Sequence, residues 1–194
     1  MGANMMLTIG SILLFGMFLS TSNKLMTGNS QIAAQNEYYI AGLSIAQSVI
    51  DEAKTKEFDE NTVGKIVSSI TGLTTVGSLG RDGGAEATVP SKDTLSSRAP
   101  YSSTNKGYFS AVKFNDVDDY NGYIRIVNTP RAENYQVRVA VNYASATFPD
   151  SAKASRTFCK TMTVKVTSPF FRAIGEVGGV AIPDTLKISY AFTY

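Results

Sequence analysis

The chain has 194 residues, enough for one ordinary domain and an appendage. Its net charge of +2 comes from dispersed basic residues, which argues against a nucleic-acid partner. It has no histidine, the commonest general base, and its single cysteine, Cys159, excludes an internal disulfide framework and a zinc–thiolate cluster. Only 18% of the residues are charged, while serine, threonine, asparagine and glycine are plentiful, which suits a secreted or surface-exposed β domain.

The first predicted element is an apolar helix for a membrane or filament core in residues 1–26. The run from Met5 to Leu19 has no charged residue, and a helix that is apolar on all sides must be buried in lipid or among other helices. Its fifteen residues span about 22 Å, short of the roughly 30 Å hydrocarbon core. A signal peptide fits poorly because no basic residue precedes the run. The expected filament-core residues are Met5, Leu7, Ile9, Ile12, Leu13, Leu14, Phe15, Phe18 and Leu19.

Residues 27–58 follow as a predicted amphipathic helix that covers a sheet and ends near Lys56–Phe58. The cluster from Thr27 to Ser30 consists of poor helix formers, so a weakened, kinked or locally extended stretch is expected there. A continuous helix from Met5 to Glu57 would be about 80 Å long, so its first half must project from the domain. The apolar stripe facing the sheet is expected to comprise Ile32, Tyr39, Leu43, Ala46, Ile50 and Ala53.

Residues 59–107 are rich in glycine, serine and threonine and are predicted to form an irregular surface region over the sheet. Residues 63–70 are compatible with a short helix or strand. The GRDGG stretch at 80–84 lacks the strand-to-helix setting of a phosphate loop and is interpreted as a flexible turn.

Residues 108–194 are predicted to form an antiparallel β domain. Alternation is clearest in 135–143, and it recurs in 161–167 and 186–193. Shorter strands are expected at 108–114 and 122–128. Such alternation indicates a sheet with one buried face, which the amphipathic helix would cover. The predicted fold class is therefore α+β.

An apolar N-terminal helix, its amphipathic continuation and a C-terminal antiparallel sheet together resemble a type IV pilin of the prepilin-type superfamily. Residues 46–52 (AQSVIDE) and 57–60 (EFDE) are similar to the helix end of MshD-like pilins. Residues 114–123 (FNDVDDYNGY) are similar to the FxDVDDYxGY stretch of that group, and 160–169 (KTMTVKVTSP) to its last hairpin.

The resemblance implies a pilin lollipop whose apolar helix packs against identical subunits in a helical filament. It also implies an inner-membrane assembly platform and an ATPase, with the subunit in the inner membrane before assembly and at the cell surface afterwards. The family carries Glu at the fifth mature position, where this sequence has Met5 and no acidic residue before Glu37. We therefore expect a variant docking contact, in a chain that either begins at its mature residue or matures by another route.

The main candidate ligand set lies in the DVDDYN stretch and consists of Asp116, Asp118, Asp119 and Asn121. Hard oxygen ligands at short spacing could bind calcium, and pseudopilins related to the resembled family bind calcium in a loop. The favoured alternative is that these side chains stabilise a turn by accepting hydrogen bonds from backbone N–H groups. The tyrosines and Cys159 are interpreted mainly as packing residues.

The predicted function is thus a structural subunit that polymerises into a type IV pilus-like filament, without catalysis, without a cofactor other than the calcium considered above, and without nucleic acid. One alternative is a minor pilin or pseudopilin that primes assembly or acts in type II-like secretion. Another is a membrane-anchored binding domain that never polymerises. The abundance of the chain in sheared surface material distinguishes the first two functions, because a major structural subunit would dominate that material and a minor pilin or pseudopilin would not.

Overall fold

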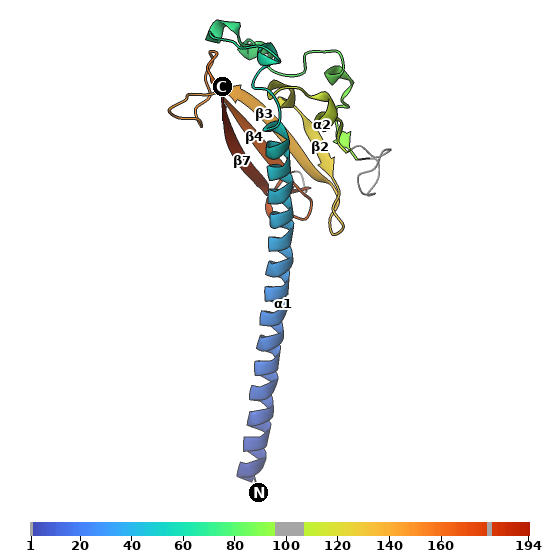
Figure 1. Cartoon of the computed structure of the whole chain (residues 1–194). Helices are drawn as coiled ribbons and strands as arrows, with labels where there is room; N and C mark the ends of the chain where they lie inside the picture. Colours follow the sequence, from blue (N-terminus) through green and yellow to red (C-terminus); the bar gives the residue numbers. More distant parts are fainter. Residues whose placement is uncertain (1, 96–106, 178–179) are drawn as a thin grey trace. The chain divides into compact units, whose positions relative to one another are not determined.

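The computed structural model describes residues 2–95, 107–177 and 180–194 (Figure 1). It divides into two units, one ending at Tyr38 and the other comprising Tyr39–Tyr194, and each is described by itself. Tyr101 and the other residues of 96–106 lie outside the described part of the chain.

The first unit consists of the apolar turns of helix α1 (Gly2–Ala53). The helix is unbroken through residues 27–30, so the predicted weak point is wrong. The Ser30 hydroxyl donates to the carbonyl of Met26 at 3.0 Å and is therefore satisfied within the helix. Extending an existing helix adds a backbone hydrogen bond for each residue, which offsets the roughly 1 kcal/mol propensity cost of Gly28.

The last turns of α1 belong to the second unit and pack on its sheet. Their buried face repeats every three to four residues and comprises Gly42, Ile45, Ala46, Val49, Ile50 and Ala53. The prediction is confirmed for Ala46, Ile50 and Ala53 but wrong for Ile32 and Leu43, which are 59% and 48% exposed. The buried face includes Gly42, which is overlooked when only apolar side chains are counted.

Helix α1 ends at Ala53, a few residues before the predicted Lys56–Phe58. The turn that follows is tighter than α-helical, because the amide of Thr55 donates to the carbonyl of Glu52, and that of Lys56 to Ala53. This tightening turns the chain away from the helix axis and into the irregular region.

A five-stranded sheet forms the body of the second unit (Figure 1). Its strands, in spatial order, are β1 (Asp93–Thr94), β2 (Ile124–Val127), β3 (Tyr135–Tyr143), β4 (Cys159–Thr167) and β7 (Thr185–Thr193). All neighbours are antiparallel except β1 and β2, so the sheet is mixed rather than purely antiparallel. With the helix on one face, the fold is α+β.

The register of β3 and β4 explains their alternating sequences. Val137 lies opposite Val166, Val139 opposite Val164, and Val141 opposite Met162. All six side chains are at most 4% exposed, as the alternation predicts. At the sheet edge, β7 is less covered, and Tyr190 is 39% exposed.

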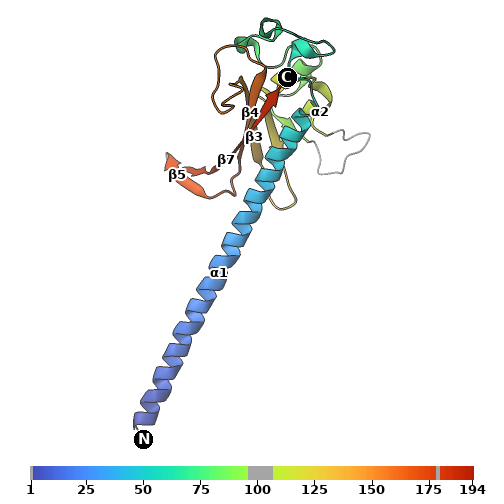
Figure 2. The ribbon, with the colours of Figure 1, turned by 60° about the vertical axis from the view of Figure 1, so that its left-hand side comes forward.

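Three local features differ from expectation. Residues 109–113 form a short helix, α2 (Phe109–Lys113), where a strand was predicted; its Ser110 amide donates to the Asp93 carboxylate. A second sheet, the hairpin of β5 (Ala173–Val177) and β6 (Val180–Pro183), was not predicted (Figure 2). Residues 63–69 form neither helix nor strand. The irregular region instead contains 3₁₀ turns η1 (Glu60–Thr62), η2 (Ile70–Gly72), η3 (Val76–Ser78) and η4 (Glu86–Thr88), and η5 (Asp118–Tyr120) follows α2.

Candidate functional site

The apolar surface of α1 is the first candidate site. All the predicted core side chains from Met5 to Leu19 are solvent-exposed, by between 46% and 75%. No charged side chain occurs before Lys24. Among the described residues, helix α1 is long enough and apolar enough in composition to cross a membrane. Monomeric soluble proteins rarely expose large contiguous apolar surfaces, so this segment is a candidate interaction or membrane surface.

The few polar side chains on this surface bond to their own helix. The Thr8 hydroxyl lies 2.9 Å from the carbonyl of Met5 and 3.1 Å from that of Asn4. The Ser11 hydroxyl donates to the carbonyl of Thr8 at 2.9 Å. Since these hydroxyls need no water, the segment can enter an apolar environment without leaving a hydroxyl donor unpaired.

A buried lysine organises the second candidate site, a polar cluster beside the end of α1. Lys160 on β4 is fully buried, and its Nζ lies 2.7 Å from Asp59 Oδ2 and 2.9 Å from the carbonyl oxygen of Phe58. The same ammonium group pairs with Asp118 Oδ1. It also lies 5.0 Å from the ring centroid of Tyr143, its register partner on β3. One buried cation therefore holds two carboxylates from separate segments.

Asp59 connects this lysine to the irregular region. Its carboxylate accepts hydrogen bonds from the amide and hydroxyl of Thr74, and the Tyr143 hydroxyl lies 3.0 Å from Oδ2. Burial disfavours the charged carboxylate, but Lys160 and the Thr74 donors outweigh burial, so the pKa of Asp59 lies below its usual value. The segment from 59 to 74 is thus fixed electrostatically to the sheet.

A second ionic network ties the last turns of α1 to β2. Arg125 Nη2 lies 2.6 Å from Glu52 Oε2, and Arg125 Nε lies 2.9 Å from the Tyr123 hydroxyl. Glu52 Oε1 accepts from the hydroxyls of Ser110, at 2.7 Å, and Tyr120, at 2.8 Å. The three contacts of Glu52 link segments that are distant in sequence, so the network is a structural clamp.

The DVDDYN turn does not gather its four predicted calcium ligands at one point. Asp118 pairs with Lys160, and Asp119 Oδ2 accepts from the backbone amide of Asn115 at 3.0 Å. The Asn121 side chain donates to the Leu79 carbonyl at 2.9 Å and accepts from the Val141 amide at 3.1 Å. The bonds of Asp119 and Asn121 to backbone groups follow the turn-stabilising alternative. Asp116 Oδ1 does so as well, by accepting from the backbone amides of Asp118 and Asp119, and the exception is Asp118, which pairs with Lys160.

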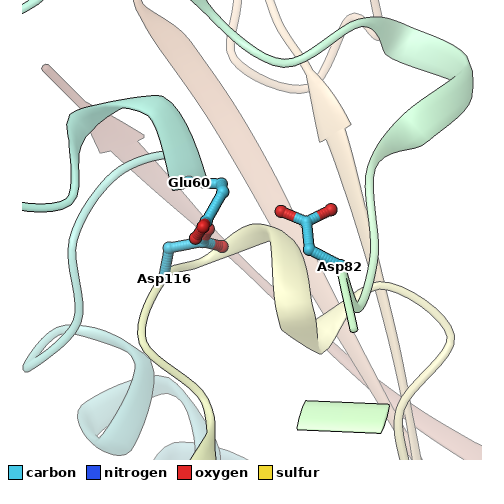
Figure 3. Close-up of side chains that lie close together, drawn as sticks. All are labelled: Glu60, Asp82 and Asp116. Atoms are coloured by element: carbon cyan, nitrogen blue, oxygen red, sulfur yellow. The ribbon is translucent and has the colours of Figure 1, made fainter. Parts of the chain in front are cut away.

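Asp116 faces acidic residues from two other segments. Figure 3 shows its carboxylate beside that of Glu60, from η1, with Asp82 of the GRDGG loop turned towards both. One carboxylate oxygen of each residue lies within 4.8 Å of the other two. The pairing of Glu57 with Asp116 in a parallel bridge, with Glu57 N 3.0 Å from the Asn115 carbonyl oxygen, brings the segments together.

The electrostatics of this region are dominated by burial. Burial, together with Asp118 and Asp119, raises the pKa of Asp116 to about 9. Burial also raises the pKa of Asp118 to about 6, against the opposing effect of Lys160, and that of Asp119 to about 7. In the absence of a further cation, these carboxyl groups therefore retain protons at pH values where an exposed aspartate is fully ionised.

The residues of both networks that sequence reasoning missed include Glu52, Asp59, Arg125 and Lys160. A signal existed for Lys160, because it shares the strand face of Met162, Val164 and Val166, so the alternation places a lysine on the buried face. The sequence offers no comparable signal for its partner Asp59. Cys159 is buried and free, and burial raises the pKa of its thiol, in keeping with a packing role.

Comparison of the chain with protein-family models, with curated proteins and with solved structures finds no match.

Proposed function

We propose that the chain is a structural subunit, a pilin, that polymerises into a type IV pilus-like extracellular filament through the apolar segment of α1. The observation that carries the proposal is the exposure of the side chains from Met5 to Leu19, uninterrupted by any charge. Lipid or the same segment of neighbouring copies would cover this surface. In a shared helical core, neighbouring helices would cover the apolar side chains on every side of the helix.

Assembly would proceed by exchange of one apolar environment for another. Before polymerisation the segment resides in the inner membrane, where its length of about 22 Å makes it a marginal span. In the filament, neighbouring helices cover side chains that lipid covered before, so this step gains little hydrophobic free energy and depends on close packing between the helices. Head-to-tail contacts that do not close on themselves extend such an assembly into a fibre. An assembly platform and an ATPase are implied by the family resemblance.

The second unit supports this role through its attachment to the helix. Tyr39 stacks on Phe171 with ring centroids 4.5 Å apart, and the face from Gly42 to Ala53 is buried. Glu52 adds its ion pair with Arg125. Because the turns that hold the sheet continue directly into the apolar segment, a subunit held by that segment would present its sheet domain to neighbouring copies.

A minor pilin or pseudopilin is the second candidate, and one observation favours it. No acidic residue precedes Glu37, whereas the resembled family uses Glu at the fifth mature position to dock on the terminal amine of a neighbour. A subunit without that contact would suit a priming or tip position in a filament built mainly from another pilin.

The decisive variant is Leu14→Asp, compared with the volume-conserving Leu14→Met in the organism that makes the protein. Leu14 is 71% exposed, so neither change disturbs the sheet domain directly. Leu14→Asp is expected to abolish filaments in sheared surface material, because a buried carboxylate in the helix core is costly. Leu14→Met is expected to retain them. Negative-stain microscopy and mass spectrometry of the principal band give the readout.

Two further measurements separate the alternatives. Membrane fractionation and near-ultraviolet circular dichroism of detergent-purified Leu14→Asp establish whether the variant inserts and keeps its sheet domain. Normal filaments containing Leu14→Asp would refute the core-bundle proposal. A wild-type chain that is scarce in abundant filaments identifies the minor subunit, and a wild-type chain absent from any sheared filament identifies the anchored domain.

A further inference from the structure

Three segments far apart in sequence bring carboxylates to one point outside the ionic networks. Glu60 begins η1, just after α1, Asp82 lies in the loop before η4, and Asp116 immediately precedes η5 (Figure 3). One oxygen of each lies within 4.8 Å of the others. Like charges at this spacing repel one another, so all three groups can be ionised together only with a cation among them; without one, at least one of them holds a proton.

Asp116 provides independent evidence that a cation binds at this cluster. The residue is 1% exposed, and its Oδ1 accepts from the backbone amides of Asp118, at 2.5 Å, and Asp119, at 3.2 Å. Its Oδ2 is buried with no hydrogen-bond partner in the described chain, and so is Glu60 Oε2. Two amides thus fix one side of a buried carboxylate that points towards Glu60, and its other oxygen has no donor (Figure 3).

No cationic side chain in the described part of the chain supplies the missing charge. Lys160 is engaged with Asp59 and Asp118, and Arg81 donates to the Val89 carbonyl at 2.8 Å. Among the described residues, no lysine or arginine forms an ion pair with Glu60, Asp82 or Asp116.

We propose that Glu60, Asp82 and Asp116 bind a calcium ion that fastens the irregular region to the turn before η5. All three ligands are hard oxygens, which favours calcium or magnesium over zinc. Two oxygens on one calcium ion, each at about 2.3–2.6 Å, lie up to about 5 Å apart, which accommodates the spacing of this cluster. Magnesium, at about 2.0–2.1 Å, requires the oxygens to move closer.

The site has a buried floor and an open side. Asp116 and Glu60 form the inner part, whereas Asp82 is exposed and leaves room for water molecules to complete the coordination shell. Gly80, Gly83 and Gly84 have positive φ values, so the loop presents Asp82 through backbone conformations that glycine favours. Calcium would therefore stabilise the sheet domain, whether or not the chain polymerises.

The test uses the full chain in detergent micelles, first stripped with a chelator and then titrated with calcium chloride by calorimetry. The expected result is saturable binding of one ion and a higher Tm of the sheet domain by circular dichroism, with a weaker response to magnesium. Asp82→Asn is expected to weaken calcium binding roughly tenfold or more, because it removes a charged ligand. No side-chain hydrogen bond of Asp82 is lost in the described chain, so this variant should fold.

Asp150→Asn is the matched control, since Asp150 is also an exposed loop aspartate but lies outside the cluster. It is expected to bind calcium as the wild type does. Absence of saturable calcium binding by the wild type would overturn the proposal. Equal calcium affinity of Asp82→Asn and Asp150→Asn would overturn the assignment of the ion to this cluster.

Discussion

Arg125 on β2 and Glu52 in the last turn of α1 form an ion pair with 2.6 Å between Nη2 and Oε2. Both side chains are largely buried, so the pair lies where water screens little. The helix ends at Ala53, the residue directly after Glu52. The pair therefore ties the last turn of the helix to β2.

Arg125→Met is expected to lower the free energy of unfolding of the sheet domain by about 3–5 kcal/mol, because it leaves the Glu52 carboxylate buried without its cation. Urea unfolding of the full chain in micelles, followed by the near-ultraviolet circular dichroism of its tyrosines, measures the change. Asp51→Asn is the control: its pair with Lys54 is exposed, so the unfolding midpoint should hardly move. Equal effects of the two variants would contradict the buried clamp.

The sheet was predictable where each strand carries its own pattern. Val137, Val139 and Val141 alternate with polar residues, and each side chain's face depends only on its position along the strand. The helix face was harder, because Gly42 has no side chain to count and Leu43 beside it is apolar yet 48% exposed. When the buried face of a helix includes a glycine, the residues that pack against the helix determine which side is buried.

The candidate site was less predictable, because its contacts depend on the folded chain. Lys160 and Asp59 are separated by 101 residues, and Glu60 and Asp82 meet Asp116 only after the irregular region folds back over the sheet end. The FNDVDDYNGY stretch did predict an acidic turn, but not that its aspartates are buried. Its spacing could not show that Asp118 would pair with a lysine while Asp116 faced other carboxylates.

Gly42→Ala tests the close approach of α1 to the sheet domain. A Cβ at this position would lie 2.7 Å from Phe171 Cζ and 3.7 Å from a Val166 methyl carbon. The Phe171 ring is confined by stacking on Tyr39 and by an edge contact with Tyr135. The variant is expected to destabilise the domain by about 1–3 kcal/mol, although alanine is the better helix former.

Gly28→Ala is the matched control on the same helix, because nothing lies within 4 Å of its added Cβ. It should leave urea unfolding of the sheet domain unchanged and raise helix content slightly. A Gly42→Ala chain as stable as the Gly28→Ala chain would show that the ring of Phe171 can yield, and that the packing is looser than the distances indicate.

With calcium removed, the stability of the sheet domain should fall as pH rises from 5 to 8. The pKa values of Asp116, Asp118 and Asp119 are raised to about 9, 6 and 7, chiefly by burial. The folded chain therefore holds more protons than the unfolded chain, whose aspartates titrate near about 3.9. Stability present at low pH is then lost as pH passes each raised pKa.

Asp59 has a lowered pKa, so its opposite contribution is confined to more acidic solution, below the ordinary aspartate range. The measurement is the Tm of the chelator-treated full chain across this pH interval. Asp116→Asn should flatten the profile and raise the Tm at pH 8, since an amide oxygen can still accept from the Asp118 amide while its NH₂ group faces Glu60. A Tm that rises towards pH 8 in the chelator-treated wild type would contradict this prediction. It would mean that other groups of the chain already neutralise the charge of these carboxylates.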